Sequence, residues 1–146
     1  MIVVAIIGLI AAMGVPSILQ MYHQDGMRKA VIDIQNACVE ARARAIEQNQ
    51  KVYLILYPPP ANRFEIQGGQ STGSGSIASG TLPAGVDIAM LDISLADYTA
   101  QPYGSVCFNP DGTSQEMTVV LHSRDEWRKI TLEYATAIAS VSDVNE

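Results

Sequence analysis

The chain opens with Met1-Ile-Val-Val-Ala-Ile-Ile-Gly-Leu-Ile-Ala-Ala-Met-Gly-Val-Pro16, and no charged side chain occurs before Asp25. About 20 residues of α-helix cross a hydrocarbon core of roughly 30 Å, and a stretch without charges favours insertion. We therefore expect residues 1–24 to form the membrane-spanning first half of a helix. A cleaved secretory signal is disfavoured, because no basic stretch precedes the apolar core. A helix buried in a soluble core is disfavoured because the stretch is apolar all round.

Three residues of this stretch weaken a helix in water, namely Gly8, Gly14 and Pro16. In lipid, small residues let helices approach closely, and proline is tolerated where neighbouring groups satisfy the freed carbonyl. The stretch is therefore suited to helix–helix packing, with a kink at the proline. We expect the packing residues to be Ile2, Val3, Ile6, Ile7, Gly8, Ile10, Gly14 and Pro16.

The next segment continues the helix with an amphipathic pattern. Apolar residues recur at spacings of three and four from Met27 to Ala45, which predicts a helix face packed on a core. Ile32, Val39 and Ile46 follow at seven-residue spacing, and we interpret them as widening the same packed face. Asn49 is a helix stop, so one long, kinked helix reaches to about residue 48.

The remainder of the chain is rich in strand-forming residues. Predicted strands cover residues 51–57, 63–67, 86–90, 105–108, 117–123 and 128–134, and residues 135–141 extend the last strand or begin another. The first two are expected to pair as a hairpin. Residues 68–80 are nearly all Gly, Ser, Thr and Gln and read as a flexible loop, and Asn109-Pro-Asp-Gly112 is a turn. A helix followed by antiparallel strands predicts an α+β fold, with residues 25–146 as one globular domain.

The charge of the chain disfavours nucleic-acid binding. Of 15 acidic and 9 basic residues, 11 and 5 lie after residue 50, so the net charge of −6 belongs to the strand-rich part. Phosphate backbones are bound by clustered Lys and Arg, which this part lacks. An acidic surface is ordinary for an exported domain.

The two cysteines leave two alternatives open. Cys38 lies in the helical segment and Cys107 in a predicted strand, so a bridge between them would join helix to sheet in an oxidising compartment. Otherwise both are unbonded thiols buried as small core residues.

A search for catalytic or metal-binding patterns finds none. His23 and His122 have no neighbours at metal-ligand spacing, and Asp87, Asp92 and Asp97 lack the glycine pattern of a calcium loop. The Gly/Ser-rich run has no lysine for a phosphate loop. Trp127, between Arg124 and Arg128, is either an exposed recognition residue or a partly buried aromatic at the end of a hairpin. We expect no enzyme activity, no metal and no cofactor.

The opening stretch through Pro16 resembles the N-terminal helix of type IV pilins and type II secretion pseudopilins. The family pattern begins with a Gly cleavage site and Phe-Thr-Leu-Ile-Glu, which this chain lacks, and Met1 matches a position just after that glutamate. Ala41-Arg-Ala-Arg-Ala-Ile-Glu-Gln-Asn-Gln-Lys-Val52 and Val106-Cys-Phe-Asn-Pro-Asp-Gly-Thr113 are similar to segments of the GspH/FimT-type minor pseudopilins. The tail from Thr136 to Asp143 departs from that pattern.

The resemblance implies a structural subunit that crosses the bacterial inner membrane once and carries its domain in the periplasm or in a filament. Its partners would be other pilins or pseudopilins, the inner-membrane assembly platform and the lipid bilayer. A minor pseudopilin of a type II secretion system is the leading function. A minor type IV pilin acting in pilus assembly or DNA uptake is the alternative, and a membrane-anchored enzyme is a third class that the search for catalytic patterns disfavours.

Overall fold

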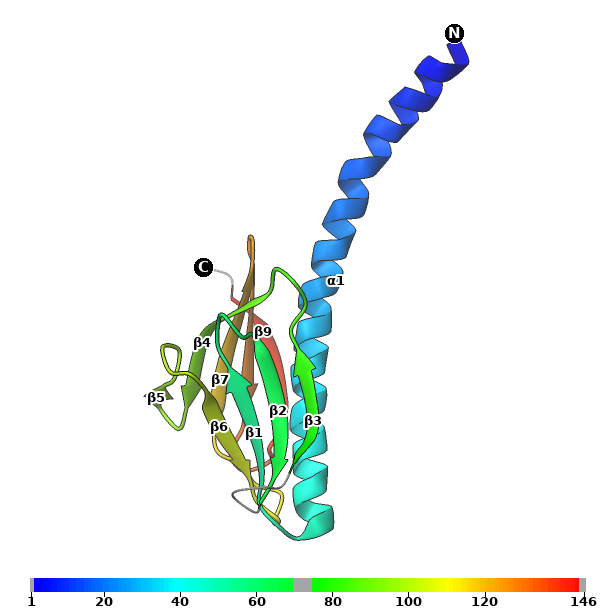
Figure 1. Cartoon of the computed structure of the whole chain (residues 1–146). Coiled ribbons are helices and arrows are strands. Elements are labelled where there is room, and N and C mark those ends of the chain that lie inside the picture. The colour runs from blue at the N-terminus through cyan, green and yellow to red at the C-terminus, as the bar shows by residue number, and fades with distance from the viewer. Residues whose placement is uncertain (1, 70–74, 145–146) are drawn as a thin grey trace.

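The computed structural model describes the backbone of residues 2–69 and 75–144 and the side chains from Asp25 onward within that part. One helix, α1 (Ile2–Gln48), precedes all the strands (Figure 1). The described strands are β1 (Val52–Tyr57), β2 (Arg63–Gly68), β3 (Ser76–Thr81), β4 (Asp87–Ile93), β5 (Ala96–Asp97), β6 (Gly104–Phe108), β7 (Met117–Ser123), β8 (Glu126–Leu132) and β9 (Ala139–Asp143).

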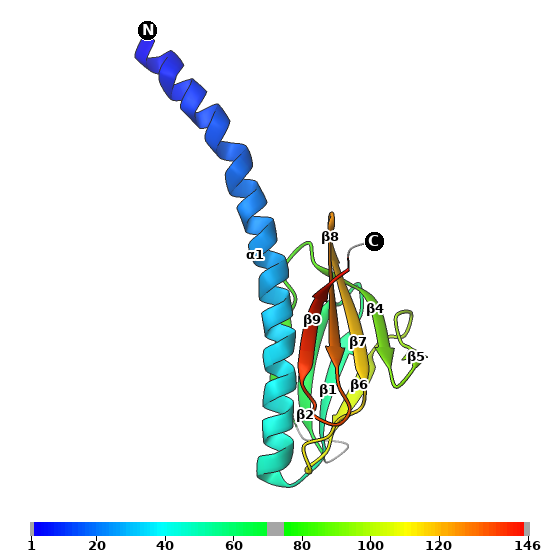
Figure 2. The ribbon, with the colours of Figure 1, turned by 180° about the vertical axis from the view of Figure 1, so that it is seen from behind.

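The strands form two antiparallel sheets that share a core with the second half of α1. One sheet has the order β3-β2-β1-β6, and the other has the order β5-β4-β7-β8-β9. Seen from behind, β9 runs beside α1 (Figure 2), and the Gln35 amide donates a hydrogen bond to the Ala139 carbonyl at 3.2 Å. The predicted α+β fold and the predicted β1–β2 hairpin are confirmed.

The helix ends where the sequence predicts. Asn49 adopts a left-handed φ of 50°, a conformation that asparagine tolerates better than most residues. The Asn49 amide then donates to the Ile46 carbonyl at 3.3 Å, and the Gln50 amide donates to the Ala45 carbonyl at 3.2 Å. These two bonds satisfy carbonyls of the last helical turn in a Schellman arrangement.

The core consists of the inward sides of α1 and of both sheets. On α1 the buried side chains recur every three or four residues, and on β7 they alternate, so one stripe and one sheet face meet. Burying each large aliphatic side chain contributes about 1.5–3 kcal/mol, which makes this shared contact the main stabilising feature. The α1 residues with no exposed surface are Met27, Ala30, Ile34, Cys38, Ala41 and Ala45.

The interpretation of Ile32, Val39 and Ile46 as core residues is wrong. Their side chains are 42%, 65% and 47% exposed. A helix turns by about 100° per residue, so positions seven apart stay on one side, and this side lies opposite the buried stripe. The three residues form an outward stripe that neither sheet covers.

The predicted loop over residues 68–80 is also partly wrong, because β3 occupies its second half and pairs with the edge of β2. β5, a strand of two residues, has no counterpart in the sequence prediction. Of the two alternatives for residues 135–141, the structure has a separate strand, β9, which pairs with β8.

The kink expected at Pro16 and the spanning segment expected over residues 1–24 fall where side chains are not described, and both stay predictions. Within the part that the structure describes, no helix is both long enough and apolar enough to cross a membrane.

Candidate interaction surfaces

The outward stripe of α1 borders a shallow groove. The groove has a volume of about 290 Å³ and lies between α1 and the segment that enters β9. Its lining is mostly apolar, with Arg42 and Gln35 as the polar members: Gln35, Val39, Arg42, Ala43, Ile46, Ala137, Ile138 and Ala139. Val39 and Ile46 line the groove from α1, the exposed Ile138 lines it from the segment that enters β9, and Ile32 extends the apolar surface along α1. Such a surface can pack against another helix.

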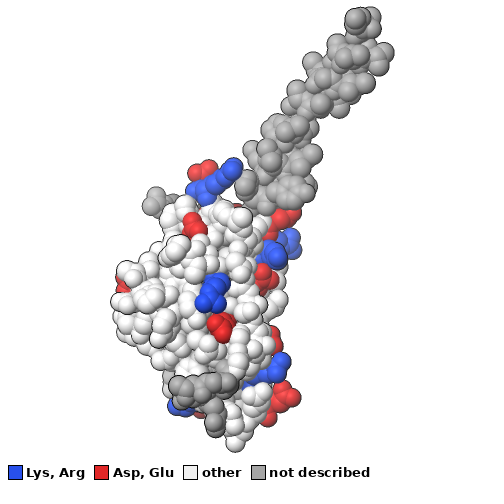
Figure 3. Space-filling view, in the orientation of Figure 1, with Lys and Arg blue, Asp and Glu red and all other residues white. Residues whose placement is uncertain are grey.

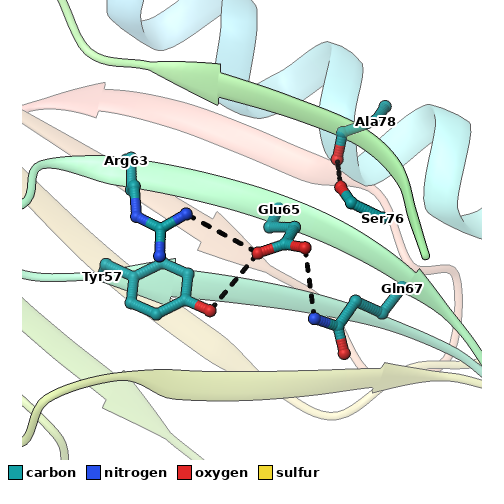
Figure 4. A network of polar contacts seen from close by, with 6 residues as sticks. All are labelled: Tyr57, Arg63, Glu65, Gln67, Ser76 and Ala78. Atoms are coloured by element: carbon teal, nitrogen blue, oxygen red, sulfur yellow. Dashed lines mark hydrogen bonds and ion pairs between the residues drawn. The ribbon is translucent and has the colours of Figure 1, made fainter. Parts of the chain in front are cut away.

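The outer face of β1 and β2 carries a closed polar network (Figure 4). The Tyr57 hydroxyl donates to Glu65 at 3.4 Å, the Gln67 amide donates to Glu65 at 3.2 Å, and Arg63 forms an ion pair with Glu65 at 3.7 Å. The Arg63 guanidinium also lies 3.9 Å from the centre of the Tyr57 ring. Burial, followed by the charge of Glu65, raises the pKa of Tyr57. With its donors already in place, the Glu65 carboxylate is a structural acceptor and not a poised base.

The predicted Asn109–Gly112 turn is confirmed, and the Asp111 carboxylate stabilises this turn by accepting hydrogen bonds within it. Asp111 accepts hydrogen bonds from the Thr113 hydroxyl at 2.7 Å and from the Thr113 amide at 2.9 Å. These bonds lower the pKa of Asp111. Arg42 donates to the Gly112 carbonyl at 3.3 Å, which ties the turn to α1.

The end of the β7–β8 hairpin brings His122 and Trp127 together. Their ring centres lie 4.1 Å apart, and the His122 Nε2 is hydrogen-bonded to the Arg124 carbonyl at 2.7 Å. Trp127 is 43% exposed, so it is an exposed aromatic at a hairpin end, and its role in recognition stays a prediction. A cleft of about 520 Å³ separates this hairpin from α1 and is lined by Asp25, Arg28, Val31, Glu126, Arg128 and Val141.

Both cysteines are free thiols, so the bridge considered for Cys38 and Cys107 is not formed. Cys38 points into the core, whereas the alternation of β6 buries Val106 and Phe108 and places Cys107 on the outer face of the sheet, half-buried. The second alternative therefore holds, except that only Cys38 is buried as a core residue. Burial raises the pKa of Cys38 to about 12.

The packing residues predicted from the sequence lie where side chains are not described: Ile2, Val3, Ile6, Ile7, Gly8, Ile10, Gly14 and Pro16. His23 lies there too. What the sequence analysis missed is the outward stripe, although its seven-residue spacing was visible. An exposed apolar stripe and a core stripe have the same spacing in the sequence, and only the position of the sheets distinguishes them.

The described residues contain no group of three or more His, Cys, Asp and Glu side chains that could hold a metal ion. Figure 3 shows charged side chains of both signs scattered over one face of the domain. Their arrangement there matches neither a basic patch for nucleic acid nor a cluster of carboxylates.

The chain resembles two solved minor subunits in fold. It matches the minor pseudopilin EpsH of the type II secretion system of Vibrio cholerae with a TM-score of 0.65 and 12% identity, over 84% of this chain and 96% of that one. It matches the type IV minor pilin FimU of Pseudomonas aeruginosa with a TM-score of 0.57 and 14% identity, over 86% of this chain and 92% of that one. No curated protein is similar enough in sequence to count as a relative.

A family model supplies the evidence from sequence. The model of the type II transport protein GspH matches residues 30–136, which include the second half of α1 and the strands from β1 to β8. This match covers well over half of the chain and agrees with the helix-and-two-sheet architecture. The chain therefore belongs to the GspH family of type II transport proteins.

Proposed function

We propose that this chain is a structural minor pseudopilin of a type II secretion system, which assembles through α1 into a periplasmic pseudopilus. Residues 1–24 would anchor it in the inner membrane and later pack in the filament, and residues 25–146 would form the periplasmic domain. Its partners would be other pseudopilins and the inner-membrane assembly platform.

The observation that carries the proposal is the outward stripe of α1. In a protein that worked alone, the helix face opposite the core would be polar, because exposed aliphatic side chains gain nothing from water. Here Ile32, Val39 and Ile46 occupy that face at seven-residue intervals. An apolar seam with this period suits packing against another helix that crosses at a shallow angle.

A type II secretion role is preferred over a pilus role because the family model carries that description and because EpsH has the higher TM-score. The likeness to FimU supports a minor type IV pilin as the second candidate. The test that separates them is deletion of the gene in its own host. Loss of protein secretion with intact pili supports the pseudopilin, and loss of pili with intact secretion supports the pilin.

The stripe is tested by Val39→Asp, expressed in place of the wild type. We expect assembly, measured by crosslinking in the cell to other subunits, to fall at least tenfold, because a carboxylate would be buried in an apolar contact. The level of folded protein should stay unchanged, since Val39 is the most exposed residue of the stripe.

The matched control is Lys29→Gln, which lowers the net charge by the same one unit at another exposed position of α1. It should leave crosslinking unchanged. Equal crosslinking by the wild type and Val39→Asp would contradict assembly through this face.

A further inference from the structure

The β7–β8 hairpin reaches toward the end of the domain from which the first half of α1 extends (Figures 1 and 2). The lining of the larger cleft places Glu126 and Arg128 beside Asp25 and Arg28 of α1. Asp25 is the first charged residue of the chain. The hairpin end therefore lies level with the boundary between the uncharged and the charged parts of α1.

The side chains at this end include an aromatic, an aliphatic and a basic residue, each exposed. Trp127 is the only tryptophan of the chain and is partly exposed. Val144 lies beside it, because the Val144 amide donates to the Trp127 carbonyl at 3.5 Å, and Val144 is exposed. Arg124 is exposed in the turn. Tryptophan is enriched at membrane–water interfaces, where its ring is at headgroup level.

The hairpin end is held in shape before it meets any partner. The His122 ring stacks on Trp127 and is bonded to the Arg124 carbonyl across the turn. Arg128 forms ion pairs with Glu126 at 2.7 Å and with Asp143, which joins β8 to β9. Little ordering is therefore needed when the surface is covered, and the exposed aromatic contributes its full contact.

Charges of both signs lie at this end. Arg124, Arg128 and Lys129 supply three positive charges, and Asp87, which pairs with His122, supplies a fourth negative charge beside Asp125, Glu126 and Asp143. A surface with this near balance has no long-range attraction to anionic lipid or to nucleic acid, and it suits headgroups that carry both signs. Contact then depends on the tryptophan and Val144.

We propose that this end of the domain, formed by Arg124, Trp127 and Val144, rests on the headgroups of the bilayer that holds α1. The inference rests on the proposed membrane-anchored subunit, because only an α1 that crosses the bilayer brings the hairpin to its surface. The domain is then held at the membrane at two places, by α1 in the bilayer and by the hairpin end on the headgroups.

The sole tryptophan makes the test direct. The full chain is placed in nanodiscs of phosphatidylcholine, with or without a spin label on the lipid headgroup, and Trp127 fluorescence is recorded. We expect the spin label to quench at least half of the emission. Anionic lipid is expected to give no stronger quenching, because this end carries no net positive charge.

The control moves the probe to the other end of β8 with the double variant Trp127→Phe/Tyr134→Trp. The five residues of strand from Trp127 to Leu132 span about 17 Å, and Tyr134, two residues further along the chain, is exposed. The spin label should leave its emission nearly unchanged, while far-UV circular dichroism checks that the variant is folded.

Two results overturn the inference, and they are distinguishable. A chain that does not co-purify with nanodiscs contradicts the membrane anchor and removes both proposals. If the chain co-purifies with nanodiscs but Trp127 is quenched no more than the tryptophan of the double variant, the hairpin contact alone is overturned.

Discussion

Cys38 has no exposed surface and lies between the helix and the sheets, where a thiolate would have no water and no positive partner. Burial raises its pKa from 9.0 to about 12. Cys107 lies on the outer face of β6, and its thiol approaches the Asn109 side-chain oxygen at 3.8 Å. Two thiols that look alike in the sequence thus have different surroundings, because helix position 38 faces the core and strand position 107 does not.

The raised pKa makes stability depend on pH in alkaline solution. Above pH 9 the unfolded chain loses the Cys38 proton, whereas the folded chain keeps it up to about pH 12. The unfolded state then binds fewer protons, so the free energy of unfolding falls as the pH rises. Urea titrations between pH 8 and pH 10.5 should show the wild type losing up to about 1.4 kcal/mol per pH unit more than Cys38→Ala. Parallel slopes for the two proteins would contradict this effect.

At the scale of elements, the spacing between the two sheets depends on Gly104. This residue begins β6 and is buried against β4 of the other sheet. A Cβ atom there would lie 2.7 Å from Leu91 Cδ2 and 2.8 Å from Ile93 Cδ1. Both side chains are buried and have little room to move. The glycine is required by close approach of the strands, because its φ is not in the left-handed region.

Gly104→Ala should therefore lower the free energy of unfolding by about 1–3 kcal/mol, the usual cost of overfilling a packed core. The measurement is urea denaturation followed by circular dichroism. Gly75→Ala is the control, because a Cβ atom there meets nothing within 4 Å. A similar loss in both variants would mean that the effect comes from the backbone and not from contact between the sheets.

Most strands were predictable from the sequence: β1, β2, β6 and β7 lie within one residue of their predicted bounds, whereas β8 begins and ends two residues earlier and β4 runs three residues further than predicted. β3 was not, because Ser76-Ile-Ala-Ser-Gly-Thr81 has few strand-forming side chains. Its pairing with β2 comes from the tertiary structure. At Gly80 an added Cβ would lie 2.4 Å from Phe64 Cζ, so the small residue that suggests a loop is needed for packing on β2. The seven-residue spacing of Ile32, Val39 and Ile46 was visible in the sequence, but whether these side chains face the core or the solvent was not.

At the scale of the whole molecule, α1 has opposite faces for two tasks. Its inner face joins both sheets into one core, in which Ile34 has no exposed surface. Its outer face carries Ile32, only two residues away but on the far side of the helix. Isoleucine thus stabilises the fold at position 34, and at position 32 it is exposed and available for assembly contacts.

The pair Ile34→Ala and Ile32→Ala separates these tasks with the same substitution on the same helix. Ile34→Ala should cost about 2–5 kcal/mol of unfolding free energy, because it leaves a cavity between α1 and the sheets. Since one core is shared, circular dichroism and Trp127 fluorescence should report a single, earlier transition. Ile32→Ala should change stability by less than about 1 kcal/mol, because its side chain is 42% exposed and lies outside the core. It should instead weaken crosslinking to other subunits, as Val39→Asp does. If Ile32→Ala destabilised the isolated subunit as much as Ile34→Ala, the outer face would belong to the core, and the argument for assembly through it would fail.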